Sequence, residues 1–242
     1  MTVRAACYFW TMKREREKRE RGKHGGKRAG AGRKRMKYRL DAPHRSRESF
    51  SQPSPVHVTM RCLRYIDHLR CDEIYRALSR VLLRYRDDRF DGVSFRVIHL
   101  SLQDNHLHLI VEAANDGALE RGMRSFTINA SRAINGVLGT AGRVFYRYHS
   151  RVIRTKRYAR NCIAYVLGNW RRHRKDVVHG QLLSALLDRY SSAISFTGWN
   201  RKFRIPAGYE PLPVSSPTTS LLKSGWAFDG PLDPWQAPGP LW

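Results

Sequence analysis

Two histidines separated by one residue are the first feature of this sequence that can support chemistry. They are His106 and His108, in the stretch Asn-His-Leu-His-Leu at residues 105–109. If this stretch is a strand, Leu107 and Leu109 point to one face and both histidines point to the other, because side chains alternate along a strand. Two imidazoles on one face can bind one metal ion, but such a pair can equally be two surface or hydrogen-bonded histidines.

A tyrosine and an asparagine on a later predicted helix are the next candidates. Thr155 can cap this helix, which is expected to run to about residue 172. Tyr165 and Asn169 are four residues apart and therefore lie one helical turn from each other. The helix has an apolar stripe of Ala159, Cys162, Ile163 and Val166, and an adjacent polar stripe of Tyr158, Asn161, Tyr165 and Asn169.

Together these side chains can make a metal-assisted nucleophile. A tyrosine hydroxyl is a poor nucleophile near neutral pH because its reference pKa is about 10. A metal ion that polarises a phosphate makes attack by the phenol oxygen feasible. His106, His108 and the amide oxygen of Asn169 form a mixed ligand set that favours Mg²⁺ or Mn²⁺. Zn²⁺ suits it less, since no third His, Cys or carboxylate stands at an obvious spacing.

The hydrophobic pattern from residue 55 onward predicts the elements that would position these residues. Their order is strand, helix, strand, strand, helix, strand, helix. The expected ranges are 56–62, 72–85, 93–101, 105–113, 115–139, 143–153 and 155–172. The first six predict an α+β fold, a ferredoxin-like split βαβ sandwich in which an antiparallel four-stranded sheet carries two helices on one face. The seventh is an additional catalytic helix, expected on the histidine face of the sheet.

The charge of the chain indicates a polyanionic partner. Lys and Arg number 45 against 20 Asp and Glu, which gives a formal net charge of +25 and a pI near 10.8. Nucleic acid is the commonest polyanion, and an anionic membrane surface is the alternative. No apolar run approaches the ~18 to 20 residues that span a bilayer, and the first ten residues make a poor signal peptide. We therefore expect a cytoplasmic, nucleoid-associated protein with no membrane partner.

Changes in composition divide the chain into three segments. Residues 1–52 are basic and contain little that could form a core, so a disordered arm is expected. Residues 53–175 carry the regular pattern and the candidate catalytic residues. Residues 176–242 form an extension rich in Pro, Gly and Trp, with a possible short helix at 181–188.

Both terminal segments contain residues that can contact nucleic acid. The mixture of Gly and Arg in the arm, which includes Arg33 and Arg35, resembles hooks that enter the minor groove, although a solvated tail explains the same composition. The tryptophans of the extension can pack on the main domain or stack on bases. These are Trp199, Trp226, Trp235 and Trp242.

The four cysteines are expected to be reduced thiols. They show no CxxC spacing, and nothing in the sequence directs the chain to an oxidising compartment. Cys62 and Cys162 fall on apolar faces and are expected in the core.

The order and spacing of the motifs resemble the single-tyrosine HUH transposases, and most closely the REP-associated tyrosine transposase branch. The histidine, bulky hydrophobic, histidine motif of that family stands here as His106-Leu107-His108. Its nucleophile motif, a Tyr followed four residues later by Asn or Gln, stands here as Tyr165 and Asn169. The likeness covers about residues 55–173 and includes the early strand motif His57-Val58-Thr59.

This resemblance implies a metal-dependent transposase, or DNA strand transferase, that cleaves and rejoins single-stranded or hairpin DNA. Tyr165 would attack a DNA phosphate and form a 5′-phosphotyrosine link, leaving a 3′-hydroxyl that can reverse the reaction without ATP. The metal would be Mg²⁺ or Mn²⁺. Two departures are visible: Trp170 stands where many relatives have Pro, and residues 103–104 are Gln-Asp instead of Met-Pro. Neither departure removes a catalytic group.

Further basic residues are expected to contact DNA. They are His57, Arg61, Arg147, His149, Arg151, Arg33 and Arg35. His57 would lie beside the histidine pair, or support it, if the first strand neighbours the third, as this fold usually has it. On the fourth strand the basic residues alternate with Tyr146 and Tyr148, which suits contacts to a DNA backbone and to bases. A solvated basic edge strand has the same pattern.

Two other functions fit the sequence. One is a non-catalytic basic binder of nucleic acid, because the same fold makes RNA-binding modules through aromatic residues on its sheet. The other is a domesticated relative that keeps the site but processes repeats of its host. Both a monomer and a homodimer are compatible with the sequence.

Overall fold

The structure is a computed structural model that describes residues 47–66, 68–86, 95–178, 181–182, 187–205 and 207–239. The predicted basic arm, with Arg33 and Arg35, lies outside these ranges up to residue 46.

Four strands form one antiparallel sheet. They are β1 (Ser54–Arg61), β2 (Phe95–Leu102), β3 (His106–Ala113) and β4 (His149–Val152). Their order is β2-β3-β1-β4, and each neighbouring pair is antiparallel. The strands form where β-branched and aromatic residues alternate with polar ones. This is the α+β, split βαβ arrangement that the sequence predicts, so the predicted fold class is confirmed.

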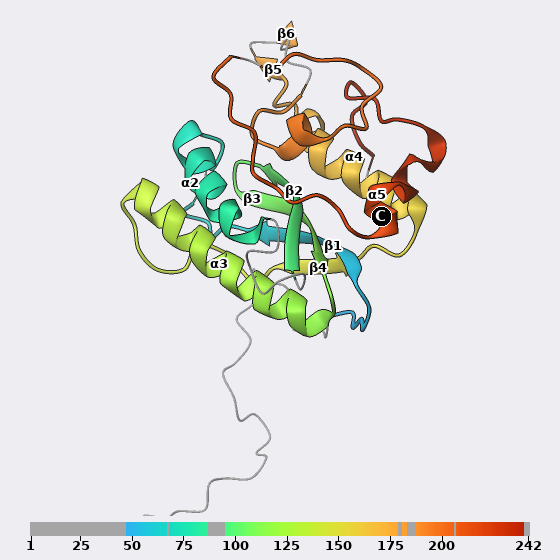
Figure 1. Ribbon diagram of the computed structural model, residues 1–242. Helices are drawn as coiled ribbons and strands as arrows, with labels where there is room; N and C mark the ends of the chain where they lie inside the picture. Colours follow the sequence, from blue (N-terminus) through green and yellow to red (C-terminus); the bar gives the residue numbers. More distant parts are fainter. Residues whose placement is uncertain are drawn as a thin grey trace, which may run out of the picture. The chain divides into compact units, whose positions relative to one another are not determined.

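Three helices lie against this sheet. They are α2 (Asp72–Leu82), α3 (Asp116–Leu138) and α4 (Lys156–Arg172). The helices α2 and α3 cover one face, and α4 lies on the opposite face (Figure 1). The seventh element therefore occupies the face on which the sequence places it.

The ends of α3 and α4 follow from their cap residues. The side chain of Asn115 accepts a hydrogen bond from the N–H of Ala118 at the start of α3. Thr155 accepts one from the N–H of Tyr158 at the start of α4. Each bond satisfies a backbone donor that the first turn of a helix leaves without a partner. Gly139 ends α3 in the left-handed conformation, with φ at 64°.

Each face of the sheet has its own apolar core. Leu107 and Leu109 of β3 are fully buried against α2 and α3. On the other face, Ile110 of β3 belongs to a smaller core with Ile163 and Val166 of α4. The alternation expected along β3 is therefore observed, and it leaves the histidine pair on the α4 face.

Two elements differ from their predicted ranges. The strand β4 has four residues, whereas a strand was expected over 143–153; before it, Phe145 forms an isolated bridge with Cys62. The helix expected from residue 181 does not begin there, because Gln181–Leu182 is the strand β6, paired with β5 (Val177–Val178). Two adjacent β-branched valines favour this extended pairing.

In the C-terminal segment, residues 187–239, the helices that the structure describes are short. They are η3 (Ser192–Ser195), α5 (Ser220–Lys223) and η4 (Gly225–Asp229); one further short helix, η1 (Leu83–Tyr85), extends α2. The segment is tied to β3 by Glu112, whose buried carboxylate accepts hydrogen bonds of 2.6–2.8 Å from the N–H and hydroxyl groups of Thr218 and Thr219.

The last part of the C-terminal segment runs along α4. Arg171 of α4 donates a hydrogen bond to the carbonyl oxygen of Pro234 at 2.7 Å. Gly168 approaches Pro238 so closely that a Cβ at Gly168 would lie 3.2 Å from the proline Cδ. The helix is therefore held between the sheet and the C-terminal segment.

The cysteines and tryptophans divide between core and surface. Cys62 and Cys162 are buried and unpaired, as predicted, and burial raises the pKa of the Cys62 thiol to about 12. Trp226 is buried and stacks at a tilt on Phe196, with ring centroids 4.9 Å apart. Trp235 is 43% exposed. Among the described residues, no helix combines the length and apolar character needed to cross a bilayer.

Candidate active and metal-binding site

The register of the sheet brings three histidines together. Thr59 of β1 pairs with His108 of β3, and Arg61 pairs with His106. Directly paired residues in an antiparallel sheet share a face, so the odd-numbered residues of β1 lie on the histidine face. His57, one step further along β1, stacks on His108 with ring centroids 5.3 Å apart. The expectation that His57 lies beside the pair is therefore met in the geometry.

Tyr165 of α4 lies directly over these rings. Its ring meets that of His108 edge-on at a centroid distance of 5.2 Å, and that of His57 at 6.1 Å. At the C-cap of the same helix, the ring of His173 lies 5.8 Å from that of His106. Tyr165 and His173 are eight residues apart, about two turns, and the helix therefore follows the histidine pair from one end to the other.

Hydrogen bonds orient the two histidines in the same way. The Nδ1 of His106 lies 2.9 Å from Oδ1 of Asn105. The Nδ1 of His108 lies 3.2 Å from both Nε2 of His57 and Oγ1 of Thr59. In each ring Nδ1 is engaged and Nε2 remains as the available nitrogen. A histidine that binds a metal through Nε2 is held in this way, because the partner of Nδ1 fixes the tautomer and the ring.

Two buried groups beside Tyr165 have polar atoms that no described protein atom satisfies. One is Nε2 of His108, and the other is the side-chain amide of Asn169, which is fully buried and has neither its oxygen nor its nitrogen hydrogen-bonded. Asn169 stands midway between Tyr165 and His173 on α4, one turn from each, so it lies over the histidine pair.

Burial keeps the histidines neutral near pH 7. Desolvation, followed by the charges of His149 and Arg151, lowers the pKa of His57 to about 4. Desolvation, followed by His173 and Arg61, lowers the pKa of His106 to about 4. The pKa of His108 is lowered well below its usual value, again chiefly by burial. Neutral imidazole is the form that binds metal ions.

Tyr165 is partly buried and protonated near neutral pH. Burial raises the pKa of its hydroxyl, while the nearby guanidinium of Arg172 acts in the opposite direction. That guanidinium carbon lies 5.7 Å from the centre of the tyrosine ring. The positive charge favours any negative charge that develops on the phenol oxygen or on a phosphate next to it.

These residues fit a divalent ion only with an amide as the third ligand. In the part of the chain that the structure describes, no three His, Cys, Asp or Glu side chains are grouped so that they could hold a metal ion. His106 and His108 offer Nε2, and Asn169 offers an amide oxygen. One amide oxygen and two imidazoles suit an ion that also takes oxygen ligands from a substrate.

The other predicted DNA-contacting residues occupy different positions. Arg61 is exposed and pairs with His106, and His149 and Arg151 are exposed on β4 opposite Thr59 and His57. All three thus lie on the site face at its rim. Arg147 lies before β4 begins. Arg33 and Arg35 lie outside the described residues.

Three residues of the site were not singled out from the sequence. Thr59 fills the space beside Nδ1 of His108, Arg172 covers Tyr165, and His173 approaches His106. Thr59 stands in the quoted strand motif, and its odd number places it on the histidine face. His173 follows Asn169 by four residues, and the helical spacing that links Tyr165 to Asn169 would have found it.

Comparisons with known proteins give only distant likenesses. No family model matches the chain, and a search of curated proteins finds no match. Among solved structures, a REP-associated tyrosine transposase bound to a REP hairpin is 15% identical and covers 55% of this chain and 74% of that one, with a TM-score of 0.43. A bacterial tRNA(His) guanylyltransferase-like protein in complex with GTP is 8% identical and covers 56% of this chain and 72% of that one, with a TM-score of 0.37.

Proposed function

We propose that this protein is a metal-dependent DNA strand transferase that cleaves and rejoins single-stranded or hairpin DNA through a covalent link to Tyr165. His106, His108 and Asn169 would hold Mg²⁺ or Mn²⁺. This reaction would serve either a transposase or a domesticated relative that processes repeats of its host. The net charge of +25 supports a nucleic-acid substrate.

The observation that favours this proposal most is the buried amide of Asn169. A buried polar group without a hydrogen bond costs about 1–3 kcal/mol, so the fold would gain from an apolar residue at this position. The same holds for Nε2 of His108. Both groups lie beside Tyr165, and a cation is the ligand that would satisfy an amide oxygen and a neutral imidazole nitrogen together.

The chemistry at Tyr165 is an exchange of one phosphodiester for another. When bound, the divalent ion would neutralise charge on the phosphate and orient it. The phenol oxygen of Tyr165 forms a bond to phosphorus as its proton leaves, and the bond from phosphorus to the 3′ oxygen breaks. The departing oxygen takes up a proton and becomes a 3′-hydroxyl. No ATP is needed, and the hydroxyl can attack the 5′-phosphotyrosine in the reverse direction.

A non-catalytic nucleic-acid binder is the second candidate function. The exposed basic residues at the rim of the site, Arg61, His149 and Arg151, support it as well as they support an enzyme. Such a binder has no need of a neutral histidine pair or of an unsatisfied buried amide. The enzyme requires the hydroxyl of Tyr165 and the binder does not, so a variant at Tyr165 distinguishes the two functions.

The first prediction concerns covalent capture of DNA. The wild type, incubated with a pool of labelled single-stranded hairpins and Mg²⁺ or Mn²⁺, is expected to retain DNA on a denaturing gel, and a chelator should abolish this. Tyr165→Phe should form no adduct while it still binds the pool.

Tyr158→Phe is the matched control. Tyr158 lies on the same helix, its hydroxyl is buried without a hydrogen bond, and burial raises its pKa to about 12. This variant should form adducts as the wild type does. Adducts that persist in Tyr165→Phe would exclude this nucleophile, and adducts that survive the chelator would exclude the metal.

A further inference from the structure

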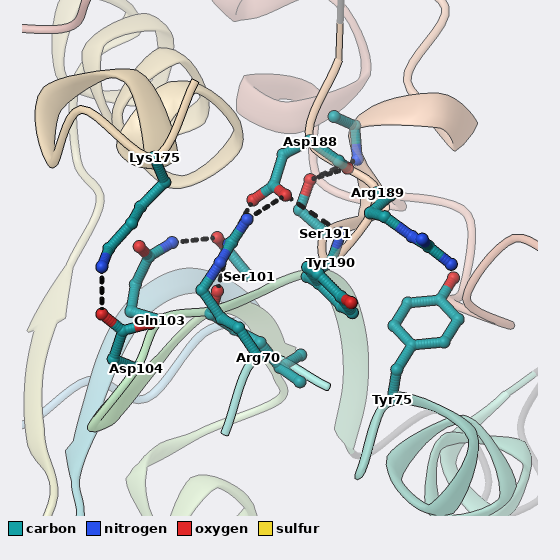
Figure 2. A network of polar contacts seen from close by, with 12 residues as sticks. Arg70, Tyr75, Ser101, Gln103, Asp104, Lys175, Asp188, Arg189, Tyr190 and Ser191 are labelled. Carbon is teal, nitrogen blue, oxygen red and sulfur yellow. Dashed lines mark hydrogen bonds and ion pairs between the residues drawn. The ribbon is translucent and has the colours of Figure 1, made fainter. Parts of the chain in front are cut away.

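A groove of about 1330 Å³ lies next to the candidate site. Its walls come from α2, from the turn between β2 and β3, from the end of α4 and from the C-terminal segment. Lys175, just beyond α4, forms an ion pair with Asp104 in the β2–β3 turn (Figure 2). Asp104 is two residues from His106, and Lys175 is two residues from His173. The groove therefore begins at the end of the site where His106 and His173 meet.

The groove is positively charged. Of the described residues that line it, seven are Arg or Lys and four are Asp or Glu. Three of these acids are already paired: Asp104 pairs with Lys175, Asp188 accepts two hydrogen bonds from Arg70 at 2.8 and 2.9 Å, and Asp72 lies 3.0 Å from Arg189. Figure 2 shows the pair of Arg70 with Asp188 and the pair of Lys175 with Asp104.

Three basic residues of the groove remain without an acidic partner among the described residues. They are Arg80, Lys202 and Arg204. All three are exposed, so their charges face solvent and a passing anion. Arg80 is on α2, and the other two are on the C-terminal segment, so they approach the groove from different parts of the chain.

Aromatic rings stand among these charges. Two guanidinium carbons lie over the ring of Tyr190, that of Arg70 at 4.9 Å and that of Arg189 at 5.2 Å from its centre. The hydroxyl of Tyr190 donates to Asp72. Tyr209 is held by a 2.7 Å hydrogen bond between its hydroxyl and that of Tyr75. The Tyr209 ring is therefore held in place, and it can offer a face to a base without losing further side-chain freedom.

We propose that this groove binds the single-stranded DNA that continues from the cleaved phosphate. This inference rests on the proposed function and names where its substrate lies beyond the reacting bond. Phosphates would contact Lys202, Arg204 and Arg80, and an unpaired base would stack on Tyr209, next to Tyr190. A positive groove with aromatic faces is typical of sites for single strands, because bases in a duplex have no free face. The volume exceeds the ~300–1,000 Å³ of a site for one small ligand.

The test measures how much a single-stranded tail improves binding to a blunt DNA hairpin. The full chain carrying Tyr165→Phe is used, so that binding is measured without cleavage. Fluorescence anisotropy compares the blunt hairpin with the same hairpin bearing a short oligo-dT tail. The tail should strengthen binding by about tenfold. With Lys202→Glu and Arg204→Glu combined, the gain should fall below about twofold, and the salt dependence of the gain should fall with it.

Arg124→Glu combined with Arg132→Glu is the matched control. Both residues are exposed on α3, on the other face of the sheet, and the change in net charge is the same. This variant should keep the full gain from the tail, and far-UV circular dichroism should show both double variants folded. If the tail gives no gain, or if both double variants lose it equally, the inference is wrong.

Photo-crosslinking gives a second measurement on the folded wild type. A tail containing 5-iodouracil should crosslink to Tyr190 or Tyr209, as identified by mass spectrometry, and crosslinks confined to β4 would contradict the groove. Failure here is distinct from failure of the proposed function. Covalent adducts without any effect of the tail would support the proposed enzyme and contradict the proposed role of the groove. An effect of the tail without covalent adducts would support the groove and indicate a non-catalytic protein that binds single strands.

Discussion

At the scale of single residues, Asn169 is a buried side chain that does not help to stabilise the fold. It is fully buried, on a helix whose neighbouring positions Leu167 and Trp170 are packed apolar side chains. Its amide satisfies none of its hydrogen-bonding capacity within the described residues. Residues that oppose stability at one point of a well-packed element are typical of functional sites.

The second prediction follows from this. Asn169→Leu should stabilise the metal-free protein by about 1–2 kcal/mol, because it replaces an unsatisfied amide with an apolar group of similar size. It should also abolish Mn²⁺ binding measured by calorimetry. Urea unfolding gives the first quantity. Asn161→Leu, an exposed position on the same helix, should change stability by less than about 0.5 kcal/mol. A loss of stability in Asn169→Leu would mean that the amide has protein partners.

At the scale of elements, the junction of β3 with the C-terminal segment depends on Glu112. Its carboxylate is 4% exposed and accepts all four hydrogen bonds offered by the backbone and hydroxyl groups of Thr218 and Thr219. Charge-assisted bonds of this kind are about twice as strong as neutral ones.

The third prediction therefore concerns Glu112→Gln. The amide group of Gln turns a donor towards an N–H and a hydroxyl, so we expect a loss of about 2–3 kcal/mol in urea unfolding. Limited proteolysis should cut the C-terminal segment faster than it does in the wild type. Glu120→Gln, an exposed change on α3, serves as the control. Equal proteolysis in both variants would show that the segment is held elsewhere.

The sequence predicts the regular elements and the main site but not the path of the C-terminal segment. Periodicity is a local signal, and it places the strands, the helices and the face of His106 and His108. Thr155 caps a helix where predicted. The Glu112 contacts depend on residues more than a hundred positions apart, and no local pattern encodes them. The groove was missed for the same reason, since its walls come from distant parts of the chain.

A one-residue irregularity in β2 also escaped prediction. The register between β2 and β3 shifts between Val97 and His99. The shift turns His99 to the α4 face, where Ile98 also lies, and His99 is buried there beside Phe196. A bulge of this kind depends on the partner strand, so alternation along β2 alone could not reveal it.

At the scale of the whole molecule, buried neutral histidines make stability depend on pH. Burial lowers the pKa of His99 to about 4 in the folded protein, against 6.5 for an unperturbed histidine. As pH falls through 6.5, His99 becomes protonated in the unfolded chain, whereas in the folded chain it stays neutral until about pH 4. The contribution of His99 to the free energy of unfolding is therefore fully present above pH 6.5. It declines between pH 6.5 and pH 4, by up to about 3 kcal/mol.

The fourth prediction tests this with His99→Asn. Nδ1 of His99 lies 3.1 Å from Oγ of Ser192, which also accepts the N–H of Leu100. The side-chain amide of Asn can donate or accept a hydrogen bond at this place but does not titrate. The variant should lose less stability than the wild type between pH 7 and pH 4.5, as measured by urea unfolding at both values. The same loss in both proteins would assign the pH dependence to other groups.

The contacts of the C-terminal segment join residues that are far apart in the chain. Arg70 and Asp188 are 118 positions apart, and the hydroxyl of Tyr75 donates to the carbonyl oxygen of Glu210, 135 positions away. Such long loops lose entropy before their contacts form, which slows folding. We therefore expect the sheet with α2 and α3 to fold first and the C-terminal segment to dock last. During that interval water and ions would reach the histidine face freely, so this order of folding would let the proposed metal ion enter before the C-terminal segment fixes α4 over the site.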